Sequence, residues 1–308
     1  MKNKVYQPAT ISEALDLTNS EKDFIFIAGG TDVIVNSKQG NAVADVMIDI
    51  NGIEELKQFT VRENYLEIGT GITLGDISRD NRIAELFPAL REAAISVATP
   101  VIRETATVGG NILCENRCNF YNQSEWWREA VGYCLKCNGD ICIVTGGNRR
   151  CFSKFISDTA VAMIGYNAEI TIVQSAGEKI IPLIDLFTGD GINPFRKEKE
   201  SIIKNIILPT DKNFRSEFRK LRPRRSLDFT SLTSVVTIDS NGIIRIALGG
   251  VDPMPILITG SVNDNLDFLI QNAVKKPRVI DNDYYPRRYR KQMIEHFVST
   301  SLNNLLKI

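Results

Sequence analysis

Short apolar runs separated by polar and glycine-rich turns fill the first part of the chain. Thr10 and Glu13 have the spacing of a capping box, in which a hydroxyl and a carboxylate bind the free amides of a helix start, so a helix is expected from there through residue 17. Thr73 is placed to cap a second, short helix. Apolar runs with β-branched and aromatic side chains predict strands at residues 24–27, 46–50 and 65–72. This part of the chain is therefore predicted to be mixed α/β.

The remainder of the chain carries longer helical patterns and two hairpins. A helix is expected over residues 83–97, with a break or a fresh start at Pro88 because proline removes an internal hydrogen bond, and with Thr99 and Pro100 ending it. Asn241 and Gly242 join two apolar runs and predict a hairpin, because both residues tolerate positive φ. The other expected elements are a capped helix at 158–164, a hairpin of 169–173 with 179–183, a hairpin of 231–238 with 243–248, and helices at 263–274 and 286–305.

The chain has 308 residues, which is more than one compact core usually holds, so two or three closely packed subdomains are expected. Lys plus Arg equals Asp plus Glu at 37 each, so no overall field attracts nucleic acid or an anionic membrane. The first residues turn polar before an apolar run reaches signal-peptide length, and no run approaches the ~18 apolar residues of a membrane span. We therefore expect a cytoplasmic protein without a nucleic-acid or membrane partner.

All six cysteines lie between Cys114 and Cys151. Random use of a small buried side chain does not produce such a cluster, and in a reducing compartment it indicates a metal site before disulfides. Two ligand sets compete, and spacing alone weighs them about equally. The set with the two close pairs of a zinc ribbon is Cys114, Cys118, Cys134 and Cys137. The set with more widely spread single cysteines, as in an iron–sulfur site, is Cys118, Cys134, Cys142 and Cys151.

Two glycine pairs are each followed by small hydrogen-bonding residues, in the sequences AGGTD at residues 28–32 and TVGGN at residues 107–111. Glycine reaches positive φ and lets a ligand approach the main chain, so such loops can aim successive amides at a diphosphate. Two of them suggest a dinucleotide, although one glycine pair alone is more often a tight turn. Neither loop fits the G-x-G-x-x-G pattern or the P-loop, so the usual NAD and nucleoside-triphosphate sites are not indicated.

Four segments, in the same order along the chain, resemble the FAD subunits of xanthine and carbon monoxide dehydrogenases in the molybdenum hydroxylase family. They are the two glycine loops, the segment SDTA at 157–160 before a helix, and the basic segment 218–228. The resemblance implies an α+β fold, with a two-lobed FAD-binding domain of the PCMH/vanillyl-alcohol-oxidase type that carries an iron–sulfur insertion, and a C-terminal α+β domain of the CO dehydrogenase flavoprotein type. The implied bounds are 1–57 and 58–200 for the two lobes, about 114–151 for the cysteine-rich insertion, and 201–308 for the C-terminal domain.

The resemblance also implies which residues bind one non-covalent FAD. The glycine loops would offer amides and hydroxyls to the diphosphate. Asp158 would accept a hydrogen bond from a ribityl or ribose hydroxyl. Lys220 would place a positive charge near the isoalloxazine ring and favour the anionic reduced flavin, although on spacing alone it belongs equally well to a solvated basic stripe with Arg222, Arg224 and Arg225. The full implied set is Ile27, Ala28, Gly29, Gly30, Thr31, Asp32, Thr107, Gly109, Gly110, Asn111, Asp158 and Lys220.

The cysteine-rich stretch resembles the insertion of the 4-hydroxybenzoyl-CoA reductases, which ordinary xanthine dehydrogenase FAD domains lack. The similarity lies in the wider cysteine spacing and in the segment YNQSEWWR at 121–128. The implied ligands of a [4Fe–4S] cluster, which would relay electrons beside the flavin, are Cys118, Cys134, Cys142 and Cys151. Cys114 and Cys137 are then expected to be small buried side chains nearby, and Trp126 and Trp127 to form the local core of the insertion.

The implied function is an electron-transfer subunit, with the substrate chemistry on another chain. It would pass electrons through FAD and the cluster in a complex with a [2Fe–2S] small subunit and a molybdopterin-binding large subunit. The insertion favours reductive dehydroxylation of an aromatic acyl-CoA, with a ferredoxin-like electron donor or acceptor, over a xanthine, aldehyde or CO dehydrogenase-type hydroxylase. Two other readings are a zinc-stabilised binding protein whose glycine pairs are mere turns, and a self-contained flavin oxidase of the same fold. His296, the only histidine, lies in a helical pattern and is not assigned to a site.

Overall fold

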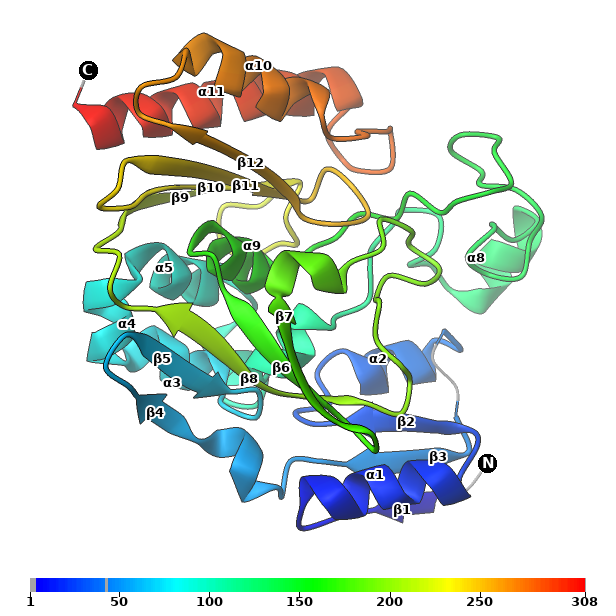
Figure 1. Cartoon of the computed structure of the whole chain (residues 1–308). Coiled ribbons are helices and arrows are strands. Elements are labelled where there is room, and N and C mark those ends of the chain that lie inside the picture. Colours follow the sequence, from blue (N-terminus) through cyan, green and yellow to red (C-terminus); the bar gives the residue numbers. More distant parts are fainter. Residues whose placement is uncertain (1–3, 42–43, 308) are drawn as a thin grey trace.

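Three β-sheets and the helices packed on them form the protein (Figure 1). The structure, a computed structural model, describes residues 4–41 and 44–307. The sheets follow one another along the chain and also through the molecule, from the N-terminal sheet to the two helices at the C-terminal end. The mixed α/β character predicted from the apolar pattern is confirmed.

The elements of the first lobe are β1 (Lys4–Tyr6), α1 (Ile11–Ser20), β2 (Phe24–Ile27), α2 (Val33–Lys38), β3 (Val46–Asp49) and the 3₁₀ turn η1 (Glu54–Lys57). The strands form a parallel sheet in the order β1-β3-β2. Helix α1 begins as predicted: the Thr10 hydroxyl accepts from the Glu13 amide at 3.1 Å, and the Glu13 carboxylate accepts from the Ala9 amide at 2.8 Å. Because the carboxyl ends of parallel strands meet at one edge, the first glycine loop leaves β2 at the edge where ligands usually bind.

The strands of the second lobe are β4 (Phe59–Val61), β5 (Tyr65–Gly69), β6 (Glu169–Gln174), β7 (Gly177–Pro182) and β8 (Ile202–Pro209). They pair antiparallel in the order β4-β5-β8-β6-β7. The predicted hairpin of β6 and β7 is confirmed. The central strand β8 was not predicted, and with it the sheet extends past residue 200 to Pro209. Strand β5 ends at Gly69, before the predicted end, because the chain there turns to bond the carbonyls of Leu56 and Gln58.

The helices of the second lobe are α3 (Leu74–Arg79), α4 (Asn81–Leu86), α5 (Pro88–Ser96), α6 (Pro100–Arg103), α7 (Val108–Ile112) and α9 (Asp158–Gly165), with the 3₁₀ turn η2 (Leu183–Leu186). The Thr73 hydroxyl caps α3 as predicted. Pro88 begins a new helix at its first position, where the missing amide costs no hydrogen bond, so the predicted fresh start is also confirmed. Thr99 and Pro100 do not end that helix as predicted: α5 already ends at Ser96, and they begin α6.

The C-terminal domain consists of β9 (Arg215–Leu221), β10 (Leu232–Ile238), β11 (Ile243–Gly249), β12 (Ile256–Ser261), α10 (Leu266–Lys275) and α11 (Arg287–Leu306). The strands form an antiparallel sheet in sequence order. The hairpin predicted at Asn241 and Gly242 is confirmed, with Gly242 at φ +74°. Helices α10 and α11 lie on the outer side of this sheet, and α5 and α9 lie on the side that faces the second lobe (Figure 1).

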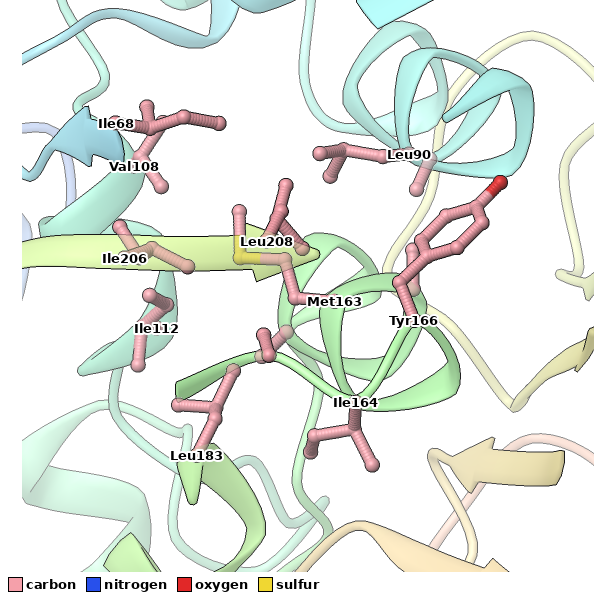
Figure 2. Close-up of a cluster of buried hydrophobic side chains, with 14 of the residues drawn as sticks. Ile68, Leu90, Val108, Ile112, Met163, Ile164, Tyr166, Leu183, Ile206 and Leu208 are labelled. Carbon is pink, nitrogen blue, oxygen red and sulfur yellow. The ribbon is translucent and has the colours of Figure 1, made fainter. Parts of the chain in front are cut away.

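Helix α9 occupies the centre of the main hydrophobic core, and all of its residues are buried. It contacts α5 and α7 within the second lobe and β10 and β11 of the C-terminal sheet. Figure 2 shows Met163 and Ile164 of α9 in the same cluster as Leu183, Ile206 and Leu208. The residues at the N-terminal end of α9 are therefore held at the junction of the second lobe and the C-terminal domain.

Tyr166, directly after α9, ties three segments together through its hydroxyl group. The hydroxyl accepts a hydrogen bond from the Ala89 amide at 3.0 Å and shares one of 2.5 Å with the Ser216 hydroxyl. We expect Tyr166→Phe to lower the free energy of unfolding by about 1–3 kcal/mol, because it leaves the buried Ala89 amide without a partner. Denaturant unfolding measures this loss. The control is Tyr285→Phe, whose hydroxyl makes one long contact of 3.5 Å with a carbonyl; equal losses in both variants would contradict the prediction.

Residues 114–151 leave the layered body as an irregular lobe, the insertion, which contains the helix α8 (Glu125–Ala130) (Figure 1). Its neck is closed by an antiparallel bridge, in which Arg117 and Lys154 exchange backbone hydrogen bonds of 3.0 and 2.8 Å. Trp127 packs on the ring of Phe120 with centroids 6.1 Å apart. Trp126 is 75% exposed, so the prediction that it belongs to the local core of the insertion is wrong.

Candidate cofactor sites

The first glycine loop, residues 28–32, needs both of its glycines for the fold. Gly30 has φ +69°, a conformation that side chains with a Cβ rarely adopt. A Cβ on Gly29 would lie 1.8 Å from the carbonyl oxygen of Thr105, so the loop packs directly on the segment that leads to the second glycine loop. Asp32 stands at the N-cap position of α2 but its side chain makes no capping hydrogen bond. The first amides of α2 are therefore not capped by that carboxylate.

Asp32 instead connects the first glycine loop to the start of the insertion. Its carboxylate accepts a hydrogen bond from the Glu115 amide at 3.0 Å and forms an ion pair with the Arg117 guanidinium. The same guanidinium lies over the ring of Phe229, 4.8 Å from its centroid. The glycine loop, the neck of the insertion and the segment before β10 thus meet at Arg117.

The second glycine loop, residues 107–111, begins α7. The Thr107 hydroxyl caps the helix by accepting from the Gly110 amide at 3.1 Å. A Cβ on Gly109 would lie 2.6 Å from Cβ of Thr70, so packing requires this glycine. Gly110 is exposed, and a Cβ there would approach only the Thr107 hydroxyl, at 3.0 Å. The fold therefore explains Gly109, whereas it gives little reason for Gly110.

A buried ion pair joins α9 to the C-terminal sheet. The Lys220 ammonium lies 2.6 Å from the Asp158 carboxylate and also donates to the Ser96 carbonyl at 3.0 Å. Asp158 further accepts from the hydroxyls of Thr233 and of Ser96, the latter at 3.3 Å. Asn111 lies next to this group, because its side-chain oxygen accepts from the hydroxyls at both flanks of Asp158, Ser157 at 2.7 Å and Thr159 at 2.6 Å.

The structure thus brings the second glycine loop, Asp158 and Lys220 into one connected set of contacts, with the first glycine loop packed beside it at Thr105. Ile27 is half-buried at the end of β2, and Thr31 is exposed. Sequence reasoning missed Ser96 and Thr233. Both are ordinary small polar residues on distant segments, and nothing in their local sequence marks them.

Four of the six cysteines line one small cavity in the insertion, with a volume of about 10 Å³. Cys114 and Cys137 are absent from its lining, which we describe among residues 4–41 and 44–307 only. Apolar and aromatic side chains, Ser153 and one lysine, Lys136, complete the walls, which include Ile280 of the C-terminal domain. The lining cysteines are Cys118, Cys134, Cys142 and Cys151.

The thiols that line the cavity are largely shielded from water. Burial raises the pKa of the Cys118 thiol to about 11 and also raises the pKa of Cys151. The amide of Ser153 donates to the Cys151 sulfur at 3.4 Å, and the backbone amides of Phe120 and Tyr121 partly oppose the rise in the pKa of Cys118. Burial likewise raises the pKa of Cys114, which lies outside the cavity. At neutral pH these thiols stay protonated unless a cation stabilises the thiolates.

Within the part of the chain that the structure describes, no three His, Cys, Asp or Glu side chains lie close enough to bind a single metal ion. The zinc-ribbon set of two close cysteine pairs is therefore not assembled. Thiolates around an iron–sulfur cluster each bind a different iron atom, so they stand farther apart than the ligands of one ion. The same finding applies to the four cavity cysteines, so neither ligand set is gathered around a single point among the described residues.

The comparison that decides the family covers the first two lobes. The model of the family described as "FAD binding domain in molybdopterin dehydrogenase" matches residues 1–211. The chain belongs to this family. The match ends just after β8, so it includes both glycine loops, the insertion and the buried Asp158.

Curated relatives of this FAD-binding family are similar over most of their length. The FAD-binding subunit of an aldehyde oxidoreductase of Escherichia coli is 28% identical over 239 residues, which are 75% of this chain and 75% of that protein. The FAD subunit of nicotinate dehydrogenase of Eubacterium barkeri is 27% identical over 244 residues, 77% of this chain and 70% of that protein.

The similarity in fold extends over the whole chain. A chain of the carbon monoxide dehydrogenase of Hydrogenophaga pseudoflava superposes with a TM-score of 0.78 at 20% identity, covering 100% of this chain and 98% of that one. A chain of quinoline 2-oxidoreductase from Pseudomonas putida gives 0.76 at 16% identity. The predicted fold, a two-lobed FAD-binding domain followed by a C-terminal α+β domain of the CO dehydrogenase flavoprotein type, is confirmed. Among the described residues, none of the helices combines the length and the apolar composition needed to cross a bilayer.

Proposed function

We propose that this chain is the electron-transfer flavoprotein subunit of a molybdenum-containing oxidoreductase complex, and that it carries a [4Fe–4S] cluster besides FAD. The observation that carries the proposal is the convergence of four widely spaced cysteines on one cavity in a chain of the FAD-binding family. The relatives named as FAD-binding subunits support placing the chemistry on the substrate in a partner chain.

The glycine loops, Asp158 and Lys220 fit an FAD. FAD supplies reversible uptake and release of electrons, one or two at a time. The first glycine loop would offer amides to the diphosphate. The Gly110 amide already donates to the Thr107 hydroxyl, so the exposed Gly110 would serve by leaving room for the phosphate. Asp158 would exchange part of its present hydrogen bonding for a hydroxyl of the cofactor, and Lys220 would then hold a positive charge beside the ring. The residues assigned to FAD are Ile27, Ala28, Gly29, Gly30, Thr31, Asp32, Thr107, Gly109, Gly110, Asn111, Asp158 and Lys220.

The insertion fits an iron–sulfur cluster better than it fits zinc. Its four cavity cysteines share one lining, and among the described residues that lining leaves out Cys114 and Cys137, two of the four zinc-ribbon cysteines. The Ser153 amide donates to the sulfur of Cys151. Such N–H···S bonds and the apolar walls are the features that tune cluster potentials. We assign Cys118, Cys134, Cys142 and Cys151 as the ligands.

The partners are a [2Fe–2S] small subunit and a molybdopterin-binding large subunit. Relatives named as FAD-binding subunits of an aldehyde oxidoreductase and a nicotinate dehydrogenase support an assembly of several chains. The cysteine-rich insertion supports the 4-hydroxybenzoyl-CoA reductase-like reaction, the reductive dehydroxylation of an aromatic acyl-CoA, with a ferredoxin-like donor. The names of the relatives favour the other candidate, a xanthine, aldehyde or CO dehydrogenase-type hydroxylase.

One purification tests the proposal. The chain is expressed with its neighbouring subunits and isolated without oxygen, and flavin, iron, zinc and acid-labile sulfide are quantified together with the co-purifying chains. We expect about one FAD and about four irons per chain. If the protein binds no iron after anaerobic reconstitution, the proposed cluster and the reductase assignment are both wrong, whereas the assignment as an FAD subunit still holds. Zinc in place of iron would support the alternative that the chain is a zinc-stabilised binding protein.

Gly110 gives a test of the FAD site that spares the fold. We expect Gly110→Val to weaken FAD binding at least about tenfold, because a side chain at this exposed position would occupy the approach of the phosphate. Titration of the apoprotein with FAD, followed by flavin fluorescence, measures the affinity. Gly52→Val is the matched control, since Gly52 is also exposed and a Cβ there meets nothing nearer than 3.9 Å. If the two variants bind FAD with equal affinity, the second glycine loop is not part of the FAD site.

A further inference from the structure

We propose that Lys136 tunes the cluster: its buried positive charge lies at the wall of the cavity that the four cysteines line, beside Cys151, and raises the reduction potential. The inference rests on the proposed function, because it requires the cluster in the cavity. Lys136 lies between Cys134 and Cys137 in the sequence, and its side chain is 5% exposed. It is the lysine among the residues that line the cavity with the four cysteines.

The ammonium group of Lys136 is held from three directions. It donates to the Gly191 carbonyl at 2.6 Å, pairs with the Glu115 carboxylate, and lies 4.8 Å from the centroid of the Tyr121 ring. The methylene stem therefore crosses the cavity wall in one orientation. A buried charge is less screened by water, so it acts more strongly on nearby groups than an exposed charge does.

Gly191 connects the Lys136 ammonium to one of the proposed cluster ligands, Cys151. Its amide donates to the Cys151 carbonyl at 2.9 Å, and a Cβ on Gly191 would lie 3.0 Å from the Cys151 sulfur. The carbonyl that accepts from Lys136 thus belongs to the residue packed directly on the sulfur of Cys151. Burial raises the pKa of the Cys151 thiol, and the charge of Lys136 opposes that rise.

The other buried lysine near the cavity does not share this arrangement. Lys154 is engaged by the Asp283 carboxylate and the Thr230 carbonyl on the side of the C-terminal domain. Glu115, by contrast, is one-third exposed and lies at the outer end of its pair with Lys136. Lys136 is thus the partner that lines the cavity, and Glu115, which is not in the lining, is the more exposed partner.

The charge arrangement has a direct redox consequence. One-electron reduction adds a negative charge to a cluster that four thiolates already make anionic, so a cation at the wall stabilises the reduced state more than the oxidised state. Removing the cation lowers the potential, and removing the anion that partly neutralises it raises the potential. Lys136 and Glu115 are thereby predicted to act in opposite directions.

The test uses the anaerobically isolated full chain with FAD bound, and follows the cluster by EPR during redox titration. For Lys136→Gln we expect the ratio of reduced to oxidised cluster at a fixed potential to fall at least tenfold, which for one electron is a shift of about 59 mV. For Glu115→Gln we expect a shift in the opposite direction. Lys197→Gln is the control, because it removes a largely buried lysine whose ammonium bonds the Glu198 and Ser201 carbonyls, away from the cavity lining.

The possible results distinguish a wrong role for Lys136 from a wrong assignment of the cluster. A Lys136→Gln protein with full iron content and the wild-type potential overturns the role of Lys136 and leaves the cluster in place. If Lys136→Gln loses its iron, Glu115→Gln decides: an unchanged or lower potential there overturns the inference. Wild-type protein that binds no iron after reconstitution overturns the proposed cluster, and the role of Lys136 with it.

Discussion

Replacing Cys142 or Cys151 by alanine is expected to reduce the iron content of anaerobically reconstituted protein from about four atoms per chain to nearly none. Each variant takes one thiolate from the cavity, and a cluster iron without its thiolate is open to solvent and tends to be lost. The broad visible absorption of the cluster should disappear with the iron, whereas the flavin bands remain. Iron analysis and the absorption spectrum of the same sample measure both.

Cys114→Ala and Cys137→Ala are the matched controls, because these cysteines are outside the lining of the cavity in the described part of the chain. Both should retain the cluster. A zinc ribbon predicts the reverse pattern, with Cys114 and Cys137 essential and Cys142 and Cys151 dispensable. Iron lost in all four variants would show instead that any cysteine change disrupts the insertion. Oxygen can strip a partly exposed cluster, so the comparison requires reconstitution of every variant under the same anaerobic conditions.

Asp158→Ala is expected to lower the free energy of unfolding by about 3–5 kcal/mol even in the absence of flavin. The substitution leaves the Lys220 ammonium, whose side chain is 6% exposed, without its carboxylate, and an unpaired buried charge is strongly destabilising. It also removes one of the two acceptors of the Thr233 hydroxyl, leaving the Thr230 hydroxyl at 2.8 Å. Urea unfolding of the FAD-free protein, followed by circular dichroism, gives the value.

Two further variants distinguish the cost of an unpaired buried charge from the cost of losing an exposed ion pair. Glu178→Ala breaks the pair with Lys204, whose side chains are 51% and 31% exposed, and should cost less than about 1 kcal/mol. The double variant Asp158→Ala with Lys220→Met removes both buried charges and should recover part of the loss. The explanation fails if Asp158→Ala costs no more than Glu178→Ala.

Local signals predicted the helix starts well. The hydroxyl caps of Thr10 and Thr73 and the restart at Pro88 lie within the segments that they organise, so the sequence around each is sufficient. Strand β8 was missed for a different reason. Its apolar run is interrupted by Lys204 and Asn205, and its place at the centre of the sheet depends on pairing with β5 and β6, which are distant in the sequence.

In the candidate sites, too, features set by the local sequence were predicted, whereas contacts between distant segments were not. The glycine loops and the cysteines are visible as local patterns, and the resemblance to a family selected one cysteine set where spacing alone left two. The pairing of Asp158 with Lys220 spans 62 residues, and Ser96 and Thr233 join it from two further segments. Trp126 misled the prediction because a tryptophan is usually buried, whereas here Arg128 takes the buried position of α8.

The neck of the insertion has a consequence for how such proteins can vary. Arg117 and Lys154 exchange two backbone hydrogen bonds, so the chain leaves and re-enters the body at neighbouring points. A loop whose ends already meet can be lengthened, shortened or replaced without moving the elements on either side of it. The insertion is in this sense a detachable module: with the proposed cluster in it, one flavin scaffold would gain or lose a redox centre through an exchange of sequence at a single surface position, while its three sheets keep their arrangement.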